Sequence, residues 1–308
     1  MFGNPDFEQR EKEEAWRNRI IYTPPVHVGQ WFEEVNKMRE ELKTIQFKRD
    51  RCDLLVQKTR AMYKNVLRPM RIAKDAPTIE FGKNYLLKSP DIPARTVIGQ
   101  NGQPKLKCGV YLAAIIDEKI IDTAQQFIKG CLLTACLERL PCVRNTFTFE
   151  GCDGQEEGKR IHYGEDFYIR IAGSDGLYVQ CENSTMNDFN EHLSVRLTDC
   201  PNGYSRFNIL NVDKDLRVET WGYDAPPNAK IIIQHTASGR NLAVEKTKLI
   251  PTFYGPEYKV SCHNFVSIQT KTETVENYWK VWTEQKIDMN AIVRAAKGEE
   301  VDDELLPD

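Results

Sequence analysis

Hydrophobic positions between residues 31 and 70 follow the spacing of one long helix. The stretch from Trp31 to Arg68 contains neither glycine nor proline, and Pro69 ends it. Apolar residues recur there at steps of three and four, which places them on one helix face. They are Phe32, Val35, Met38, Leu42 and Ile45. Such a helix would be roughly 55 Å long, and its stripe weakens after Ile45. We therefore expect its second half, or a break near Asp50, to depend on a partner for burial.

From residue 79 the pattern changes to short apolar runs separated by glycine and proline, which is typical of β-strands. The run at 79–87, IEFGKNYLL, aligns with the run at 161–169, IHYGEDFYI. A weaker third copy covers residues 228–233, with Asn228 in place of the glycine. Each copy closes with a large aromatic residue, one intervening residue and an apolar residue. The closing triplets are Phe147-Thr148-Phe149, Phe207-Asn208-Ile209 and Trp279-Lys280-Val281.

This threefold repetition predicts a mainly β fold, specifically a β-trefoil over residues 79–283. In such a fold six strands form a short barrel and six cap it, so few strand edges stay open. The range is longer than three lean repeats need, and residues 117–140 carry apolar positions at helical spacing up to Pro141. We therefore expect an inserted helix near 117–140. The flanking segments predict an N-terminal arm at 1–30, and a short helix followed by an acidic tail at 284–308.

Charge is segregated along the chain although the net charge is only −3. Between Lys43 and Lys74 ten Lys or Arg stand against two Asp, a net of +8. From Lys297 to the end one Lys stands against six acids, a net of −5. A block of like charge is commonly a solvated face. The alternative is a basic strip that docks on an acidic partner, a protein or a polyanion.

Several classes of protein do not fit this composition. The longest stretch without Asp, Glu, Lys or Arg, from Ile20 to Phe32, is 13 residues, whereas a membrane-spanning helix needs about 20. The start, MFGNPDFEQREKEEAW, has neither a basic cap nor an apolar core, so we expect no secretory signal. Nine scattered cysteines then predict reduced thiols. A pI near 6.1 argues against a general nucleic-acid binder.

The sequence carries no motif for catalysis, metal or cofactor. Four of the cysteines, at 131, 136, 142 and 152, are separated by four, five and nine residues, which is not the pairing that holds zinc. The five histidines are dispersed, and no nucleophile elbow or phosphate-binding fingerprint occurs. His162 and His235 fall in expected strands, where hydrogen-bonded structural histidines are the expected role. We expect no enzyme, no cofactor, no metal and no small-molecule substrate.

Two binding roles remain open beside a structural one. Sugar-binding trefoils of the ricin type carry Gln-x-Trp in each repeat, but the positions here read Asn145-Thr146-Phe147, Ser205-Arg206-Phe207 and Asn277-Tyr278-Trp279. A lectin is thus disfavoured. A cytosolic β-trefoil adaptor that recognises a small anionic ligand or a peptide is the main alternative.

Residues 228–243 resemble the MIR class of β-trefoils. Further stretches, in one order from about residue 26 to 283, resemble the cilia- and flagella-associated protein 161 family of microtubule inner proteins. Cys52 stands where that family has glycine, and His27 where it favours arginine. The matching stretches are Val28-Gly29-Gln30-Trp31, Lys48-Arg49-Asp50 with Leu54 and Gln57, NVLRPM at 65–70, Arg144-Asn145-Thr146-Phe147, IHYGEDF at 161–167 and PNAKI at 227–231.

The resemblance implies a structural protein on the luminal wall of the A-tubule of ciliary and flagellar doublets, where it would stabilise the axoneme. The implied partners are α/β-tubulin and neighbouring microtubule inner proteins, with no nucleic acid and no membrane. Tubulin is strongly acidic, so the basic strip suits it, and Trp31 would serve as an apolar anchor. The tubulin-binding residues we expect are Trp31, Lys48, Arg49, Arg51, Lys58, Arg60 and Lys64.

Overall fold

The computed structural model describes residues 31–74, 77–98, 104–152, 154, 157–174, 176–181, 192–284, 293–294 and 297. The arm expected at 1–30, and all of the expected tail except residues 284, 293–294 and 297, lie outside these residues. The chain forms two compact units, Met1–Gln57 and Lys58–Asp308.

The predicted single helix over 31–70 is wrong, because the structure has two helices there. They are α2, Trp31–Asp50, and α3, Leu55–Val66. In α2 the first turn is acidic and the last is basic, which complements the helix dipole. The C-terminal part of its apolar stripe is exposed, since the side chains of Leu42 and Ile45 are each more than half exposed, whereas Val35 and Met38 are half-buried.

Local capping explains the break between the helices. Cys52 adopts a left-handed conformation with φ 60°, and its N–H donates to the Arg49 carbonyl at 3.1 Å. The Asp53 N–H donates to the Lys48 carbonyl at 2.8 Å, which completes a Schellman motif. Gln57 caps the C-terminal end of α2 and the N-terminal end of α3. Its side chain donates to the Arg49 carbonyl and accepts from the Leu54 N–H. The break near Asp50 that the weakening stripe suggested is therefore built into residues 48–57.

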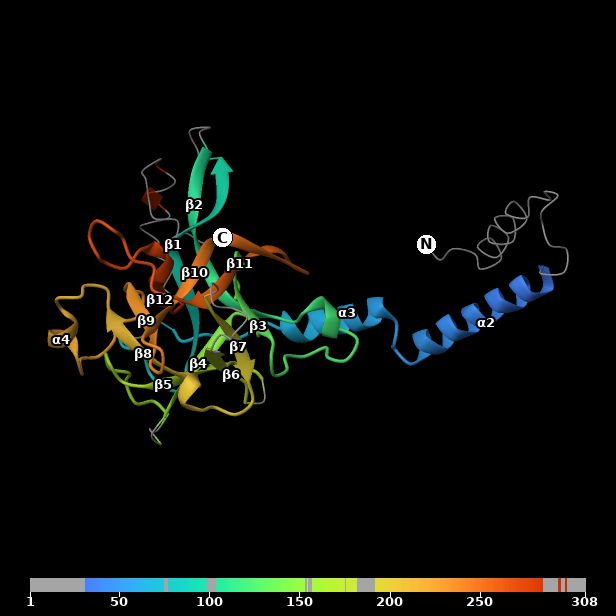
Figure 1. Ribbon diagram of the computed structural model, residues 1–308, viewed down its shortest axis with the longest axis horizontal. Helices are drawn as coiled ribbons and strands as arrows, with labels where there is room; N and C mark the ends of the chain where they lie inside the picture. The colour runs from blue at the N-terminus through green and yellow to red at the C-terminus, as the bar shows by residue number, and fades with distance from the viewer. Residues whose placement is uncertain are drawn as a thin grey trace. The chain divides into compact units, whose positions relative to one another are not determined.

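The second unit contains one sheet of twelve strands in its described residues (Figure 1). A mainly β fold was predicted and is confirmed. The strands are β1 Asn84–Ile98, β2 Pro104–Ile115, β3 Leu132–Cys136, β4 Thr146–Gly151, β5 Phe167–Ile171, β6 Tyr178–Cys181, β7 Leu193–Thr198, β8 Arg206–Asn211, β9 Ile231–His235, β10 Arg240–Thr252, β11 Gly255–Cys262 and β12 Tyr278–Trp282. One short helix, α4 Arg217–Thr220, follows β8.

Most of the antiparallel pairings fall into two sets, and the pairs β1–β2, β5–β6 and β9–β10 connect these sets. Strands β1, β4, β5, β8, β9 and β12 pair in that order, and β12 pairs back with β1, so these strands close a ring. The remaining strands form the hairpins β2–β3, β6–β7 and β10–β11. The hairpins are joined to one another because β3 pairs with β7, β7 with β11, and β11 with β3.

The predicted equivalence of Gly82, Gly164 and Asn228 is confirmed by the backbone. All three are left-handed, with φ of 80°, 79° and 59°, and glycine or asparagine adopts that conformation most easily. Each donates its N–H at 2.9 Å to the last residue of a closing triplet, namely Phe149, Ile209 and Val281. The three turns are thus tied to the three closing strands by the same bond.

The helix expected near 117–140 is also wrong. That stretch contains a three-residue 3-10 turn, Glu118–Ile120, then further turns and strand β3. Gly130 is left-handed, with φ 89°, and donates its N–H to the Leu197 carbonyl, so a helix cannot run through it. Pairing of β3 with β2 outweighs the helical spacing, and Ile121, Phe127 and Cys131 are buried from turns instead.

One large core fills the second unit. Phe147, Phe207 and Trp279, the closing aromatics, are all fully buried in it, as predicted. α3 contributes Met62 and Val66 to the same core. This helix is therefore a fixed part of the second unit from Lys58 onward.

Candidate functional site

The seven residues expected to bind a partner lie on α2, on α3 and at the junction between them. Trp31 begins α2, but its side chain is outside the described residues. Lys48 and Arg49 lie in the last turn of α2 and are exposed. Arg49 pairs with its neighbour Asp50 at 2.9 Å, and both side chains remain about two-thirds exposed at 61% and 66%. Such a pair contributes little to stability, so Arg49 can exchange it for another acid.

Arg51 and Phe47 form a small cationic and aromatic surface at the end of α2. The Arg51 guanidinium lies 4.0 Å from the centre of the Phe47 ring, while the Phe47 side chain remains 56% exposed. An arginine held on an aromatic face keeps its N–H groups free to pair with a carboxylate. Arg60 and Lys64, one turn apart on α3, are also exposed.

Lys58 does not belong to this surface. Its Nζ donates to the Asp122 carbonyl at 3.1 Å and lies 3.6 Å from the Asp122 carboxylate. Only 18% of the Lys58 side chain is exposed. This contact helps to hold α3 on the second unit, and the expected role of Lys58 in binding a partner stays a prediction.

Sequence reasoning missed the residues that hold α3 in place. The Tyr63 hydroxyl donates to the Phe253 carbonyl at 2.9 Å, and its ring meets that of Tyr254 edge to face at 5.4 Å. Asn65 donates to the Gln125 carbonyl. Phe253 and Tyr254 lie in the turn between β10 and β11, so the tip of this hairpin packs against α3. No spacing in the sequence connects Tyr63 with residues 190 positions away.

A buried ion pair between Arg144 and Glu257 lies next to Tyr254. The Arg144 Nη2 atom is 2.8 Å from both carboxylate oxygens of Glu257, and Thr134 donates to the same carboxylate at 2.7 Å. The guanidinium also stacks on Tyr254, 3.8 Å from the ring centre. Burial raises the pKa of the Tyr254 phenol, so this group stays neutral and acts as a packing surface. Arg144 appeared in the sequence only within the motif that precedes Phe147.

No group of three His, Cys, Asp or Glu side chains in the described ranges could hold a metal ion. All nine cysteines are free, and burial raises the pKa of Cys136 to about 12, which makes its thiol unreactive. His235 is buried in β9 and bonded to Ser238 and to the Tyr204 carbonyl, as expected of a structural histidine.

A cavity of about 420 Å³ opens beside the end of α3, between Val66, Phe127 and Leu177. Arg68 is the one charged residue in its lining, and no carboxylate, histidine or thiol accompanies it. Ser174 supplies the one hydroxyl of the lining, and its Oγ donates to the Ile171 carbonyl at 2.9 Å. In the ranges that the structure describes, no helix is long and apolar enough to cross a membrane.

Comparisons with known proteins point to one family. A family model described as "Cilia- and flagella-associated protein 161-like domain" matches residues 58–187 and 185–284, well over half of the chain. The cilia- and flagella-associated protein 161 of Bos taurus is 28% identical over 270 residues, covering 85% of this chain and 82% of that protein. The Mus musculus protein of the same name is 29% identical over 272 residues, covering 85% and 88%.

Among solved structures, an SDF2-like protein from Arabidopsis thaliana aligns with a TM-score of 0.44 at 10% identity, covering 67% of this chain and 94% of that one. The family match spans both α3 from Lys58 onward and the whole closed ring of strands. The chain belongs to the cilia- and flagella-associated protein 161 family.

Proposed function

We propose that this protein is a non-enzymatic microtubule inner protein, which binds tubulin on the luminal wall of the A-tubule and stabilises the axoneme. The family name supports the ciliary setting, and one observation carries the tubulin contact. This is the exposed basic and apolar end of α2, where Lys48, Arg49 and Arg51 lie beside uncovered Ile45 and Phe47. Arg60 and Lys64 are further exposed cations, on the part of α3 that belongs to the second unit.

The chemistry of this surface fits an acidic protein lattice. Each exposed ion pair contributes only about 0–1 kcal/mol, but a cluster acts together and steers association. Apolar side chains among the cations then supply area that a partner can bury. Leu42, Ile45 and Phe47 are each more than half exposed, at 55%, 51% and 56%, which suits an element that becomes covered on binding.

The proposal includes the fold of the second unit, which we assign as a β-trefoil. The closed ring of six strands, the three joined hairpins and the three equivalent turns at Gly82, Gly164 and Asn228 support this assignment. A second ring of bonds supports it too. Ile161 donates its N–H to the Ile79 carbonyl, Ile79 to Ala225, and Ala225 to Ile161. A threefold axis would produce this cyclic pattern.

Charge reversal tests the tubulin contact. Replacing Lys48, Arg49 and Arg51 together by Glu should abolish co-sedimentation of the full-length protein with microtubules, because the cations would become acids facing an acidic wall. The melting temperature should stay nearly unchanged, since these side chains are exposed and bonded only locally in the described structure. A matched variant with Lys119, Lys129 and Lys159 changed to Glu alters net charge equally and should still bind.

Loss of stability without loss of binding would show that the strip packs within the protein, and would end the tubulin proposal. A cytosolic adaptor is separated from a lattice protein by fractionation. The lattice protein should remain in salt-washed axonemes in a fixed ratio to tubulin, whereas an adaptor should be recovered wholly in the soluble fraction.

A further inference from the structure

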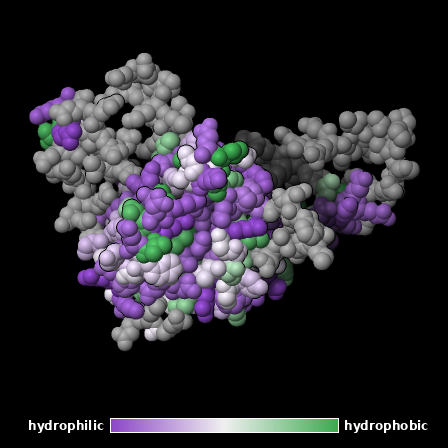
Figure 2. Space-filling model, turned by 60° about the vertical axis from the view of Figure 1, so that its left-hand side comes forward, coloured by the Kyte–Doolittle hydropathy of each residue, from purple (hydrophilic) through white to green (hydrophobic). Residues whose placement is uncertain are grey.

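The loop between β8 and β9, residues 211–224, holds an unusual set of apolar side chains in solvent. Leu216, Val218, Trp221 and Tyr223 are 42%, 84%, 60% and 67% exposed. The side of the molecule that carries α4 in Figure 1 is turned forward in Figure 2, which shows apolar atoms gathered among hydrophilic ones. Contiguous exposed apolar surface commonly marks an interaction site, and Trp and Tyr are favoured anchors there.

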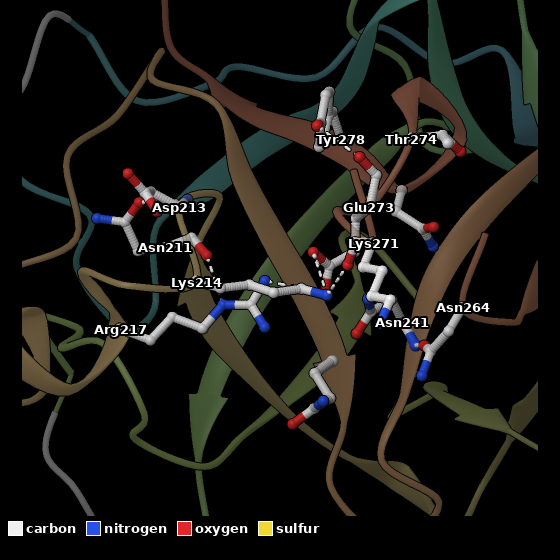
Figure 3. A network of polar contacts seen from close by, with 12 residues as sticks. Asn211, Asp213, Lys214, Arg217, Asn241, Asn264, Lys271, Glu273, Thr274 and Tyr278 are labelled. Carbon is white, nitrogen blue, oxygen red and sulfur yellow. Dashed lines mark hydrogen bonds and ion pairs between the residues drawn. The ribbon is translucent and has the colours of Figure 1, made fainter. Parts of the chain in front are cut away.

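Ion pairs to a single carboxylate fix the loop in place. Arg217 Nη2 lies 3.0 Å from Glu273 Oε1, and Lys214 Nζ lies 3.5 Å from Glu273 Oε2. Lys214 also donates to the Lys271 carbonyl at 2.6 Å, as Figure 3 shows. Glu273 is only 7% exposed and the Arg217 side chain 20%, so the bond between them is shielded from solvent, whereas the Lys214 side chain is 40% exposed. A loop ordered in this way loses little conformational entropy when it binds.

The position of Trp221 depends on a glycine. Gly164 is left-handed, and a Cβ on it would overlap the indole ring of Trp221. One face of the indole therefore packs on the Gly164 turn, while the side chain stays 60% exposed. Backbone bonds hold the same region, because Gly222 donates to the Tyr163 carbonyl and Tyr163 to the Tyr223 carbonyl.

The charges left on the loop are acidic. Both of its cations, Lys214 and Arg217, are already paired with Glu273. Asp213, Asp215 and Glu219 are exposed, and none of them forms an ion pair within the described part of the chain. A partner must therefore be cationic as well as apolar. Two copies of this loop facing each other would set acids against acids, which disfavours a symmetric dimer through this face.

We propose that loop 211–224 is a docking surface for a basic segment of another protein, in which Lys or Arg alternates with aliphatic side chains. Val218, Trp221 and Tyr223 would bury the aliphatic side chains, and Asp215 and Glu219 would pair with the cations. Acidic tubulin does not have this chemistry, so the surface serves a different partner from the basic strip. The inference holds whether or not α2 binds tubulin.

The test uses the full-length protein and two synthetic amphipathic helices, one of leucine and lysine, the other of leucine and glutamate. Calorimetry should show binding of the lysine helix that weakens with salt, and no binding of the glutamate helix. The double variant Val218→Ser/Trp221→Ser should weaken binding of the lysine helix at least about tenfold. The double variant Asp215→Asn/Glu219→Gln should weaken binding of the lysine helix and reduce the salt dependence of that binding.

A control variant, Leu140→Ser, changes an apolar residue of similar exposure, 65%, outside the loop and should bind as the parent does. Melting temperatures of the variants at Asp215, Glu219 and Leu140 should match that of the parent, because these side chains are exposed. Trp221→Ser should lower the melting temperature slightly, because one face of the indole packs on the Gly164 turn. Equal binding of both helices, or binding that the loop variants leave unchanged, would overturn the proposal. So would self-association in sedimentation equilibrium that Val218→Ser abolishes, since the occupant would then be a second copy of this chain.

Discussion

Cys52 occupies a backbone position that a side chain disfavours. Its φ of 60° is left-handed, and a Cβ there costs roughly 1–2 kcal/mol. The strain persists because the Schellman bonds from Cys52 and Asp53 to the end of α2 require this conformation. The resemblance indicated the position, because it implies glycine there, but it did not reveal that the reason is the end of a helix.

We therefore expect Cys52→Gly to stabilise the junction between α2 and α3 by about 1 kcal/mol. Hydrogen exchange at the amides of residues 52 and 53 should slow roughly fivefold, because these N–H groups form the capping bonds. Asp53→Gly is the matched control, since Asp53 is not among the left-handed residues, and its exchange should speed up. Faster exchange in Cys52→Gly would show that the thiol side chain itself holds the turn.

At the scale of elements, α3 illustrates why charge alone does not identify a docking face. Lys58, Arg60 and Lys64 are equivalent in sequence, yet Lys58 is directed to Asp122 while Arg60 and Lys64 remain exposed. The buried face is set by Met62 and Val66, four residues apart, which pack into the core. The helical period predicts such a face, but which cation borders it depends on Asp122, which lies just after the 3-10 turn Glu118–Ile120.

Tyr63 should be the main attachment of α3. Tyr63→Ala removes both the bond to the Phe253 carbonyl and the edge-to-face contact with Tyr254, and should cost about 3 kcal/mol of unfolding free energy. Denaturant unfolding measures the loss, and hydrogen exchange should show it concentrated in α3. Arg60→Ala, on the exposed side of the same helix, should change stability by less than about 0.5 kcal/mol. Equal effects of the two variants would mean that α3 is not held through Tyr63.

The stretch 117–140 shows the limit of periodicity as a guide. Its apolar residues become buried only in part, since Ile121, Phe127 and Cys131 are buried whereas Ile128 and Leu140 are exposed. The type of element was also predicted wrongly. Positions three and four apart can also be buried from successive turns when a strand such as β3 must pair with β2. By contrast, the turns at Gly82, Gly164 and Asn228 were predictable. A turn that needs a left-handed residue favours glycine or asparagine, and these residue types can be recognised in the sequence. No local sequence pattern indicates the Arg144–Glu257 pair, because the two residues are 113 positions apart.

For the whole molecule, the threefold repetition leads to a prediction about cooperativity. Phe147, Phe207 and Trp279 are fully buried at equivalent positions in β4, β8 and β12, and all three belong to one core. The ring of strands has no free edge at which one repeat could separate from the others. Loss of any one closing aromatic should therefore weaken the whole unit rather than its own repeat.

Phe147→Ala, Phe207→Ala and Trp279→Ala should each lower the unfolding free energy by about 3–5 kcal/mol. Trp279→Ala belongs at the upper end, because its indole N–H also donates to the Leu242 carbonyl at 2.9 Å. Each variant should still unfold in a single transition when near- and far-ultraviolet circular dichroism are compared. Tyr204→Ala, at a 46% exposed aromatic residue, is the control and should have little effect. A cost below about 1 kcal/mol at any of the three positions, or separate transitions by the two probes, would contradict a single core shared by three equivalent repeats.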